Sequence, residues 1–312
     1  MTPRTANTVR ELLLDASRAL EASGVDSARL NSELLLGHVL NSPRLHLLLN
    51  AQLIPTNAQI LEFQRLIELR ALRHPLQHLT GTAAFLGCDV AVNRQVLVPR
   101  PETETLALRA LNLMEGRGAV TLMDLGTGSG CLSIALALAL PQAMVHALDI
   151  SAAALAMAQK NAESNGVDHR IHFHHGNCFQ ALRAVAAATS DPSRGQANTS
   201  PGLGGFDLIV SNPPYIPSAE IEHLQPEVRD HDPRNALDGG HDGLDFYRIL
   251  AAEGAVWLKP TGFLVAEFGD DQGASIQQLF QPNRGWSISR LEKDLSGRDR
   301  VIIVGTATRA NL

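Results

Sequence analysis

The sequence predicts a doubly wound α/β domain with a mainly parallel sheet, preceded by a small helical bundle. Three observations support this. Helical periodicity alone occurs over residues 5–73, a short stretch of alternating hydrophobicity lies between Pro75 and Pro101, and strand-like and helix-like segments alternate from Val120 onward. The interpretation divides the chain into residues 1–74, a linker of residues 75–101, and residues 102–312.

Apolar residues recur at three- and four-residue spacing in the first part, which is typical of amphipathic helices. The first such segment contains Val9, Leu12 and Leu20 and closes at Gly24. A second follows over residues 27–40, a third begins after Pro43, and a fourth covers residues 55–73. Four helices without intervening strands predict a bundle that serves as a packing or dimer module or docks a partner. We favour docking.

The linker contains the run "DVAVNRQVLV", in which apolar and polar residues alternate. Asn93 divides the run, and asparagine is a frequent turn residue. We therefore predict a two-stranded hairpin that turns at Asn93.

Seven strand-like runs predict the strands of the sheet: residues 120–125, 144–150, 170–175, 206–210, 262–268, 286–292 and 300–306. Helical patterns lie between several of them, at residues 131–140, 152–165, 244–258 and 272–280. Residues 186–205 are rich in small, turn-forming residues, and we expect a mobile surface insertion there without an assigned function.

Charge and composition exclude some classes of protein. The formal net charge is −6 and the chain has only three lysines, which argues against stable binding to duplex nucleic acid. The longest apolar run, residues 131–140, is half the length of a membrane span, and no secretory signal is evident. Three widely spaced cysteines (Cys88, Cys131 and Cys178) fit a reducing compartment. We expect a soluble cytoplasmic protein without a membrane partner.

The segment "DLGTGSGCL" follows the first strand of the sheet and has glycines at positions 126, 128 and 130. These glycines allow a sharp turn and close contact between a ligand and the main chain. A tight turn without a ligand, or a dinucleotide site, would have a similar pattern. However, the third glycine of the dinucleotide fingerprint would fall at Cys131.

Two carboxylates point to a different ligand. Asp124 precedes the first glycine by two positions, where a carboxylate can hold a cationic amino group such as that of S-adenosylmethionine. Asp149 ends the second strand, where a carboxylate can accept both hydroxyls of a ribose. Asn177 and Cys178 follow the third strand, and we expect them to border the adenine.

The segment "SNPPYIP" comes directly after the fourth strand, at the carboxyl edge of the sheet where ligands bind in doubly wound folds. The Asn212 side chain and the carbonyl of Pro213 or Pro214 supply two acceptors, and Tyr215 supplies a flat face. Because prolines fix φ and carry no N–H, the acceptors are rigid. This arrangement suits a planar –NH₂ group, either an amide or the exocyclic amine of adenine.

The chain resembles the release-factor glutamine N5-methyltransferases, which methylate the glutamine of the Gly-Gly-Gln motif of peptide-chain release factors. The resemblance extends from about Pro75 to Ile303 and is carried by "PLQHLTG", "FLG", "VLVPRPETE", "DLGTGSG", "NPPYI", "EVRDHDPRNALDGG" and "KDLSGRDRVI". "NPPY" alone is shared with adenine-N6 methyltransferases, whereas "LVPRPETE" and "ALDGG" are the narrower signature.

The resemblance implies a small helical domain joined by a β-hairpin to a seven-stranded, Rossmann-like methyltransferase domain that uses S-adenosylmethionine and no metal. It implies release factors as the protein substrate. It also implies roles for particular residues. The residues implied to contact S-adenosylmethionine are Gly126, Thr127, Gly128, Ser129, Gly130, Asp149, Cys178 and Asn212. The residues implied to grip the glutamine and to be catalytic are Asn212, Pro213, Pro214 and Tyr215.

Other residues have two interpretations each. Arg100 and Glu102 either flank the active-site cleft, as the resemblance implies, or simply begin a helix after the linker. Phe85 either shields the methyl group or belongs to the core. His172, His174 and His175 lie in one strand without the spacing of a metal site. An adenine-N6 nucleic-acid methyltransferase and a non-catalytic cofactor-binding docking protein remain as alternative functions.

Overall fold

The structure is a computed structural model that describes residues 7–189, 205–281 and 285–306. The chain forms two compact units. One comprises residues 1–82 together with 225–231, and the other comprises residues 83–224 together with 232–312. Over the described ranges, no helix combines the length and the apolar character needed to cross a bilayer.

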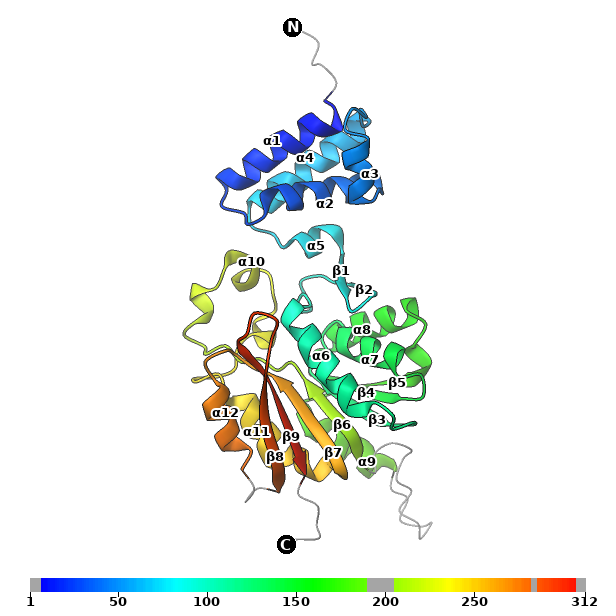
Figure 1. The fold of residues 1–312 in the computed structure, drawn as a ribbon, viewed down its shortest axis with the longest axis vertical. Coiled ribbons are helices and arrows are strands. Elements are labelled where there is room, and N and C mark those ends of the chain that lie inside the picture. Colours follow the sequence, from blue (N-terminus) through cyan, green and yellow to red (C-terminus); the bar gives the residue numbers. More distant parts are fainter. Residues whose placement is uncertain (1–6, 190–204, 282–284, 307–312) are drawn as a thin grey trace. The chain divides into compact units, whose positions relative to one another are not determined.

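The helical unit is a bundle around one apolar core (Figure 1). Its main helices are α1 (Val9–Ala22), α2 (Ala28–Leu40), α3 (Arg44–Leu49), α4 (Asn57–Ala71) and α5 (Leu76–Thr80). Thr8 and Thr56 are the N-cap residues that precede α1 and α4, and each forms a capping box with the residue three positions later. Such caps satisfy backbone N–H groups that have no partner within the helix. The predicted helical region is therefore confirmed.

The helical unit also includes a segment from far along the chain, Gln225–His231, with the short helix α10 (Pro226–Arg229). Glu227 attaches this segment. Its Oε1 accepts hydrogen bonds from Arg70 Nη2 at 2.9 Å and from Arg73 Nε at 2.6 Å. Burial alone would raise the pKa of Glu227, but the hydrogen bonds from both arginines outweigh this effect and lower the pKa.

A two-stranded hairpin of β1 (Thr82–Phe85) and β2 (Cys88–Ala91) confirms the predicted hairpin, but the predicted turn is wrong. The chain turns at Leu86 and Gly87, which both have positive φ values of 43° and 82°. Two-residue hairpin turns with positive φ at both positions match the twist of the strands. Asn93 lies beyond β2.

The predicted seven-stranded sheet is confirmed, with the order β5-β4-β3-β6-β7-β9-β8. Neighbours are parallel from β5 to β7, and β9 is antiparallel to both β7 and β8. The strands are β3 (Thr121–Leu125), β4 (Met144–Asp149), β5 (Ile171–His175), β6 (Phe206–Ser211), β7 (Leu258–Glu267), β8 (Trp286–Lys293) and β9 (Asp299–Thr306).

The strand order reverses at β3. The chain moves outward from β3 through β4 to β5 and then returns to place β6 on the other side of β3. Loops that leave such a switch point diverge to opposite faces and open a crevice at the carboxyl ends of the strands. The loop after β3 and the segment after β6, which begins at Asn212, both leave the sheet there.

Alternate residues of each strand pack into separate cores on the two faces of the sheet. In β3, Leu122 belongs to one core and Met123 to the other, as expected for a parallel sheet that is covered on both faces. Helices α6 (Pro101–Met114), α7 (Cys131–Ala139) and α8 (Ala152–Ser164) contribute to the first core. Helices α9 (Cys178–Thr189), α11 (Asp245–Trp257) and α12 (Gly273–Leu279) contribute to the second.

The region predicted as an insertion, residues 186–205, is described only at its ends. Residues 186–189 are the last part of α9, and Gly205 directly precedes β6. Residues 190–204 lie outside the described residues.

Candidate active site

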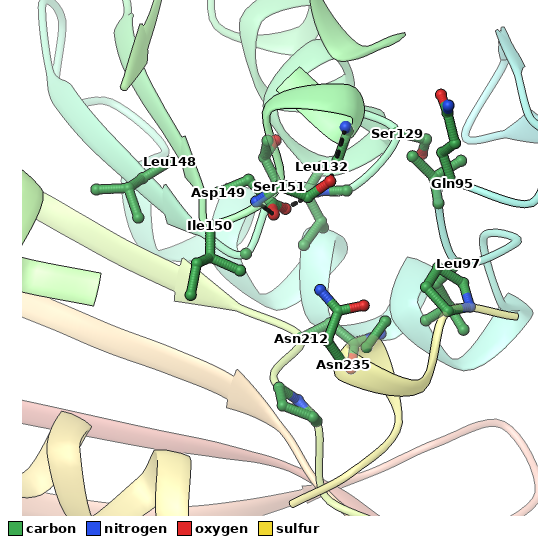
Figure 2. Close-up of a pocket in the computed structure, with 18 of the residues that line it drawn as sticks. Gln95, Leu97, Ser129, Leu132, Leu148, Asp149, Ile150, Ser151, Asn212 and Asn235 are labelled. Atoms are coloured by element: carbon green, nitrogen blue, oxygen red, sulfur yellow. Dashed lines mark hydrogen bonds between the residues drawn. The ribbon is translucent and has the colours of Figure 1, made fainter. Parts of the chain in front are cut away.

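A cavity of about 270 Å³ lies at the switch point, within the sheet-containing unit. The loops after β3, β4, β5 and β6 contribute to its wall (Figure 2). The lining includes nine of the residues predicted from the sequence: Gly126, Thr127, Gly128, Ser129, Asp149, Asn177, Cys178, Asn212 and Pro214. The carboxyl ends of neighbouring parallel strands thus bring together residues that lie up to 88 positions apart.

The glycine-rich loop turns directly into α7. Gly128 has a φ of 56°, a conformation that L side chains rarely adopt, and nothing lies within 4 Å of the position a Cβ would take there. Gly130 does not line the cavity. It lies against α8, where an added Cβ would come within 3.0 Å of Ala158 Cβ. The two glycines therefore have different roles: Gly128 leaves open space at the cavity, whereas Gly130 permits close helix packing.

Asp149 ties the loop to the end of β4. Its Oδ2 accepts from the Gly128 amide at 2.9 Å and its Oδ1 accepts from the Ser151 amide at 2.8 Å. Each carboxylate oxygen has a second lone-pair direction, so both can still accept from a ligand. Burial raises the pKa of Asp149, and the backbone hydrogen bonds oppose this effect. Figure 2 shows Asp149 and Ser151 together at the cavity wall.

Asp124 is fully buried beneath the loop and does not line the cavity. Its Oδ2 accepts hydrogen bonds from the hydroxyls of Thr127 and Ser133, both at 2.7 Å. Burial raises the pKa of Asp124 to about 6, although the two hydroxyl groups lower it. In this structure Asp124 fixes the glycine-rich loop from below, rather than facing the cavity as the sequence suggested.

The residues after β6 divide between the cavity and the interior. Asn212 and Pro214 line the cavity, and Figure 2 shows the Asn212 amide projecting into it. Pro213 and Tyr215 are not among the lining residues. The Tyr215 side chain packs against the second core, and burial raises the pKa of its hydroxyl, with the charge of Glu267 adding to the effect.

The "LDGG" segment supports the "NPPYI" backbone. The Ile216 amide donates to the Leu237 carbonyl at 3.0 Å, and the Gly239 amide donates to the Ile216 carbonyl at 2.8 Å. A Cβ on Gly239 would come within 2.9 Å of the Pro214 carbonyl oxygen. This close approach requires glycine.

Sequence reasoning missed several residues of the wall. Thr103, in the first turn of α6, lines the cavity, whereas the nearby Arg100 and Glu102 do not. The missed residues also include Gln95, Val96, Leu97 and Pro99 from the linker, Ile150, Ser151 and Ala154 after β4, and Pro233, Asn235, Ala236 and Phe246 from the segments that precede and begin α11. The only available signal was that several of these residues belong to "LVPRPETE" and "DPRNALDGG".

Arg100 holds one part of this wall in place. It immediately precedes α6, with Pro101 at the first helical position, and its Nη2 lies 2.5 Å from Asp232 Oδ2. Burial raises the pKa of Asp232 to about 6, and the charge of Arg100 opposes this effect. Both interpretations of "VPRPETE" thus describe part of the structure: it begins a helix, and it contacts the cavity wall.

Phe85 and the histidines singled out in the sequence have structural contacts in the fold. Phe85 is buried in the first core. His146 and His174 form a hydrogen bond of 2.9 Å across β4 and β5, and His172 stacks obliquely on His146. Within the described ranges no group of three histidine, cysteine, aspartate or glutamate side chains is arranged to hold a metal ion.

Two family models match the chain. One, described as "PrmC N-terminal domain", matches residues 11–81, and one described as "Ribosomal protein L11 methyltransferase (PrmA)" matches residues 101–189. The chain is 39% identical to a release factor glutamine methyltransferase of Geobacter sulfurreducens over 95% of each chain. The chain belongs to the release factor glutamine methyltransferase family.

Two further relatives with the same name show a similar degree of identity. The chain is 38% identical to the relative from Moorella thermoacetica, with 95% of this chain and 98% of the relative covered. It is 41% identical to the relative from Rhodospirillum rubrum, with 91% and 81% covered. Because members of this family are methyltransferases, this chain is an enzyme that transfers a methyl group.

A solved structure shows the same fold. The hMettl16 catalytic domain, solved in complex with the MAT2A 3′UTR hairpin 6, aligns with a TM-score of 0.52 at 14% identity, with 82% of this chain and 84% of that chain covered. At this identity the likeness concerns the fold alone.

Proposed function

We propose that this enzyme transfers the methyl group of S-adenosylmethionine to the side-chain amide nitrogen of the glutamine in the Gly-Gly-Gln motif of peptide-chain release factors. One observation carries the proposal: relatives named release factor glutamine methyltransferase match 95% of the chain, and the chain places an Asn-Pro-Pro-Tyr segment at a cavity beside a glycine-rich loop. The enzyme is expected to act in the cytoplasm, where release factors are found.

The cavity fits S-adenosylmethionine. At Gly126 and Gly128 nothing lies within 4 Å of the position that a Cβ would take, so a ligand can approach the main chain of this loop. Asp149 retains acceptor capacity for ribose hydroxyls, and Asn177 and Cys178 line the part of the cavity after β5. When bound, S-adenosylmethionine supplies an electrophilic methyl group on a sulfonium.

Asn212 and a neighbouring carbonyl are the proposed acceptors for the substrate amide. The carbonyl of Pro213 or Pro214 is the proposed second acceptor beside Asn212 Oδ1, and of these two prolines Pro214 lines the cavity. Two acceptors hold both hydrogens of the –NH₂ group and orient the nitrogen lone pair toward the methyl group. The substrate nitrogen gains a methyl and releases one proton to solvent, so orientation and electrostatics contribute more than a general base.

The helical unit is proposed to dock the release factor. Large apolar side chains are exposed on α3 and the loop after it: Leu45, Leu49, Leu53 and Ile54 are each more than half exposed. Contiguous exposed apolar groups of this kind often mark protein–protein contacts.

A nucleic-acid substrate is the second candidate, because an Asn-Pro-Pro-Tyr segment also suits the exocyclic amine of adenine. The net charge of −6 and the small number of lysines disfavour it, since binding to phosphates needs a cationic surface. A non-catalytic docking protein is a poorer alternative for a member of a methyltransferase family.

The test is to incubate the enzyme with methyl-labelled S-adenosylmethionine and either a release factor or DNA. We expect label on the release factor, located by mass spectrometry at the Gly-Gly-Gln glutamine. The label should disappear when that glutamine is replaced by alanine or when the enzyme carries Asn212→Ala. Label on DNA, or label that survives the glutamine replacement, would refute the proposal.

A further inference from the structure

Three side chains from different elements form a hydrogen-bonded chain behind the cavity. Asn212 Nδ2, after β6, donates to Thr103 Oγ1 in α6 at 2.9 Å. Thr103 Oγ1 in turn donates to Glu267 Oε2, at the end of β7, at 2.7 Å. Thr103 and Glu267 are almost completely buried, whereas Asn212 reaches the cavity.

The sheet register accounts for the proximity of Asn212 and Glu267, the two ends of this hydrogen-bonded series. Ser211 of β6 pairs with Ala266 of β7, so Asn212, the first residue after β6, and Glu267, the last residue of β7, lie at the same level of the sheet. Pro101 begins α6 immediately beside them and sets Thr103 in its first turn. The arrangement therefore depends on two strand ends and a helix start, which are rigid elements.

The hydrogen bonds between Asn212, Thr103 and Glu267 all run in one direction when Glu267 is ionised. A carboxylate only accepts hydrogen bonds, so the Thr103 hydroxyl must donate its single proton to Glu267. The remaining lone pairs of Thr103 Oγ1 then require a donor, which is Asn212 Nδ2. With Nδ2 held in this way, Oδ1 is the end of the amide that is free to accept from a ligand in the cavity.

We propose that Thr103 and Glu267 are positioning residues that fix the side-chain amide of Asn212 with its carbonyl oxygen toward the substrate –NH₂ group. This inference rests on the proposed role of Asn212 as the substrate acceptor. An amide rotated by 180° would place Oδ1 against an oxygen that has no proton to offer and would present an N–H donor to the substrate. Neither contact is favourable.

The direction of these hydrogen bonds depends on whether Glu267 is protonated. Burial raises the pKa of Glu267 to about 7; Thr103, Tyr215 and the charge of Arg300 lower it, and the charge of Glu102 raises it. The Tyr247 hydroxyl contacts the Glu267 backbone carbonyl, not the carboxyl. Once protonated, Glu267 can donate to Thr103, and Thr103 can then donate to Asn212 Oδ1. The ionised state, which exists above this pKa, therefore keeps the productive orientation.

Thr103→Val tests the role of the hydrogen bonds between Asn212, Thr103 and Glu267, because it replaces the hydroxyl with a methyl of similar size. We expect kcat to fall at least about tenfold while the affinity for S-adenosylmethionine, measured by calorimetry, stays within about twofold. Thr103→Ser restores the hydroxyl and should recover most of the lost kcat. Thr105→Val, the same change two positions along α6, is the matched control and should behave as wild type.

Glu267→Gln supplies the readout that a merely structural role would not move. In the wild type, kcat should decrease as the pH falls through about 7, and this limb should be absent in Glu267→Gln. Wild-type kcat in Thr103→Val, equal losses in Thr103→Val and Thr103→Ser, or an unchanged acidic limb in Glu267→Gln would each overturn the inference.

A measurement without turnover separates this inference from the proposed function. In protein with ¹⁵N-labelled asparagine, NMR should show slow exchange of an Asn212 Nδ2 proton in the wild type and faster exchange in Thr103→Val. Equal exchange in the two proteins would overturn the inference even if the wild type methylates release factors. Failure of the wild type to methylate them would instead overturn the proposed function.

Discussion

The carboxylate of Asp149, at the end of β4, accepts a hydrogen bond of 2.9 Å from the amide of Gly128, in the loop after β3. The contact links the ends of two neighbouring strands at the wall of the cavity. It holds the glycine-rich loop in the conformation that leaves its main chain open to a ligand. The same carboxylate is the proposed partner of the ribose.

Asp149→Ala should therefore weaken binding of S-adenosylmethionine roughly 10- to 100-fold, because two backbone donors and the ligand lose a charged acceptor. Isothermal titration calorimetry measures the change. Asp168→Ala, an exposed position before β5, should leave the affinity unaltered. An affinity for Asp149→Ala equal to that of the control would show that the carboxylate does not support the ligand site.

Gly130→Ala should destabilise the sheet-containing unit by about 2–4 kcal/mol. The left-handed conformation (φ 83°) contributes ~1–2 kcal/mol, and the approach of a Cβ to Ala158 contributes the rest. Gly116→Ala is the matched control, since its φ is 74° and nothing lies within 4 Å of its Cβ position. Urea denaturation should show the smaller loss, ~1–2 kcal/mol, for the control. Equal losses would show that α8 moves aside at no cost.

Glu227→Gln should lower the free energy of unfolding of the helical unit by about 1–3 kcal/mol, because the nearly buried Arg70 loses its ionic partner. Glu222→Gln removes an exposed ion pair with Arg234 and should cost at most ~1 kcal/mol. Denaturant unfolding followed by circular dichroism compares the two variants. A greater loss of unfolding free energy in Glu222→Gln than in Glu227→Gln would contradict the stabilising role of Glu227.

The contribution of Glu227 should also depend on pH. Its pKa in the folded protein lies below the ordinary value of 4.5, so its stabilisation is present above pH 4.5 and is lost as the pH falls through the lower, folded value. The difference in stability between the wild type and Glu227→Gln should thus shrink below pH 4.5. A stability difference that grows in acid would contradict the lowered pKa of Glu227 in the folded protein.

His146 should make the protein less stable in mild acid. Burial lowers the pKa of His146 from 6.5 to about 4, and nearby His174 and His172 add to the effect. The unfolded chain therefore binds a proton between pH 6.5 and 4 that the folded protein does not, and stability falls as the pH decreases across this range.

His146→Gln should remove up to ~3 kcal/mol of that pH-dependent loss. The measurement is the free energy of unfolding at pH 7 and pH 4.5, with the exposed His169→Gln as control. A pH dependence in His146→Gln equal to that of the wild type would refute the role of this histidine.

Local patterns in the sequence were sufficient to predict the strands of the sheet and two segments that meet at the cavity. Short apolar runs locate the strands because both faces of the sheet are covered, and the doubly wound order then brings Gly128, Asp149 and Asn212 to one edge. Each of these residues lies at or just after a strand end, so its position needs little information beyond the local pattern.

Contacts between distant elements could not be predicted in the same way. Thr103 looks like an ordinary residue of a helix start, and Glu267 looks like a polar strand end; only the register of β6 and β7 brings both beside Asn212. The turn at Asn93 illustrates a different failure. Asn93 does form a turn, with its side chain accepting from the Gln95 amide, but the hairpin turns earlier, at Leu86, where leucine gives no signal for a positive φ.

The inclusion of Gln225–His231 in the helical unit has a practical consequence for dissecting the enzyme. A fragment that ends at Thr82 would retain Arg70 and Arg73 but lack the carboxylate that neutralises them, and the complementary fragment would retain Glu227 without its arginines. Mixing the two pieces should therefore be more informative than studying either alone. Their reassociation would restore an ion-pair cluster whose three members come from both sides of the cut.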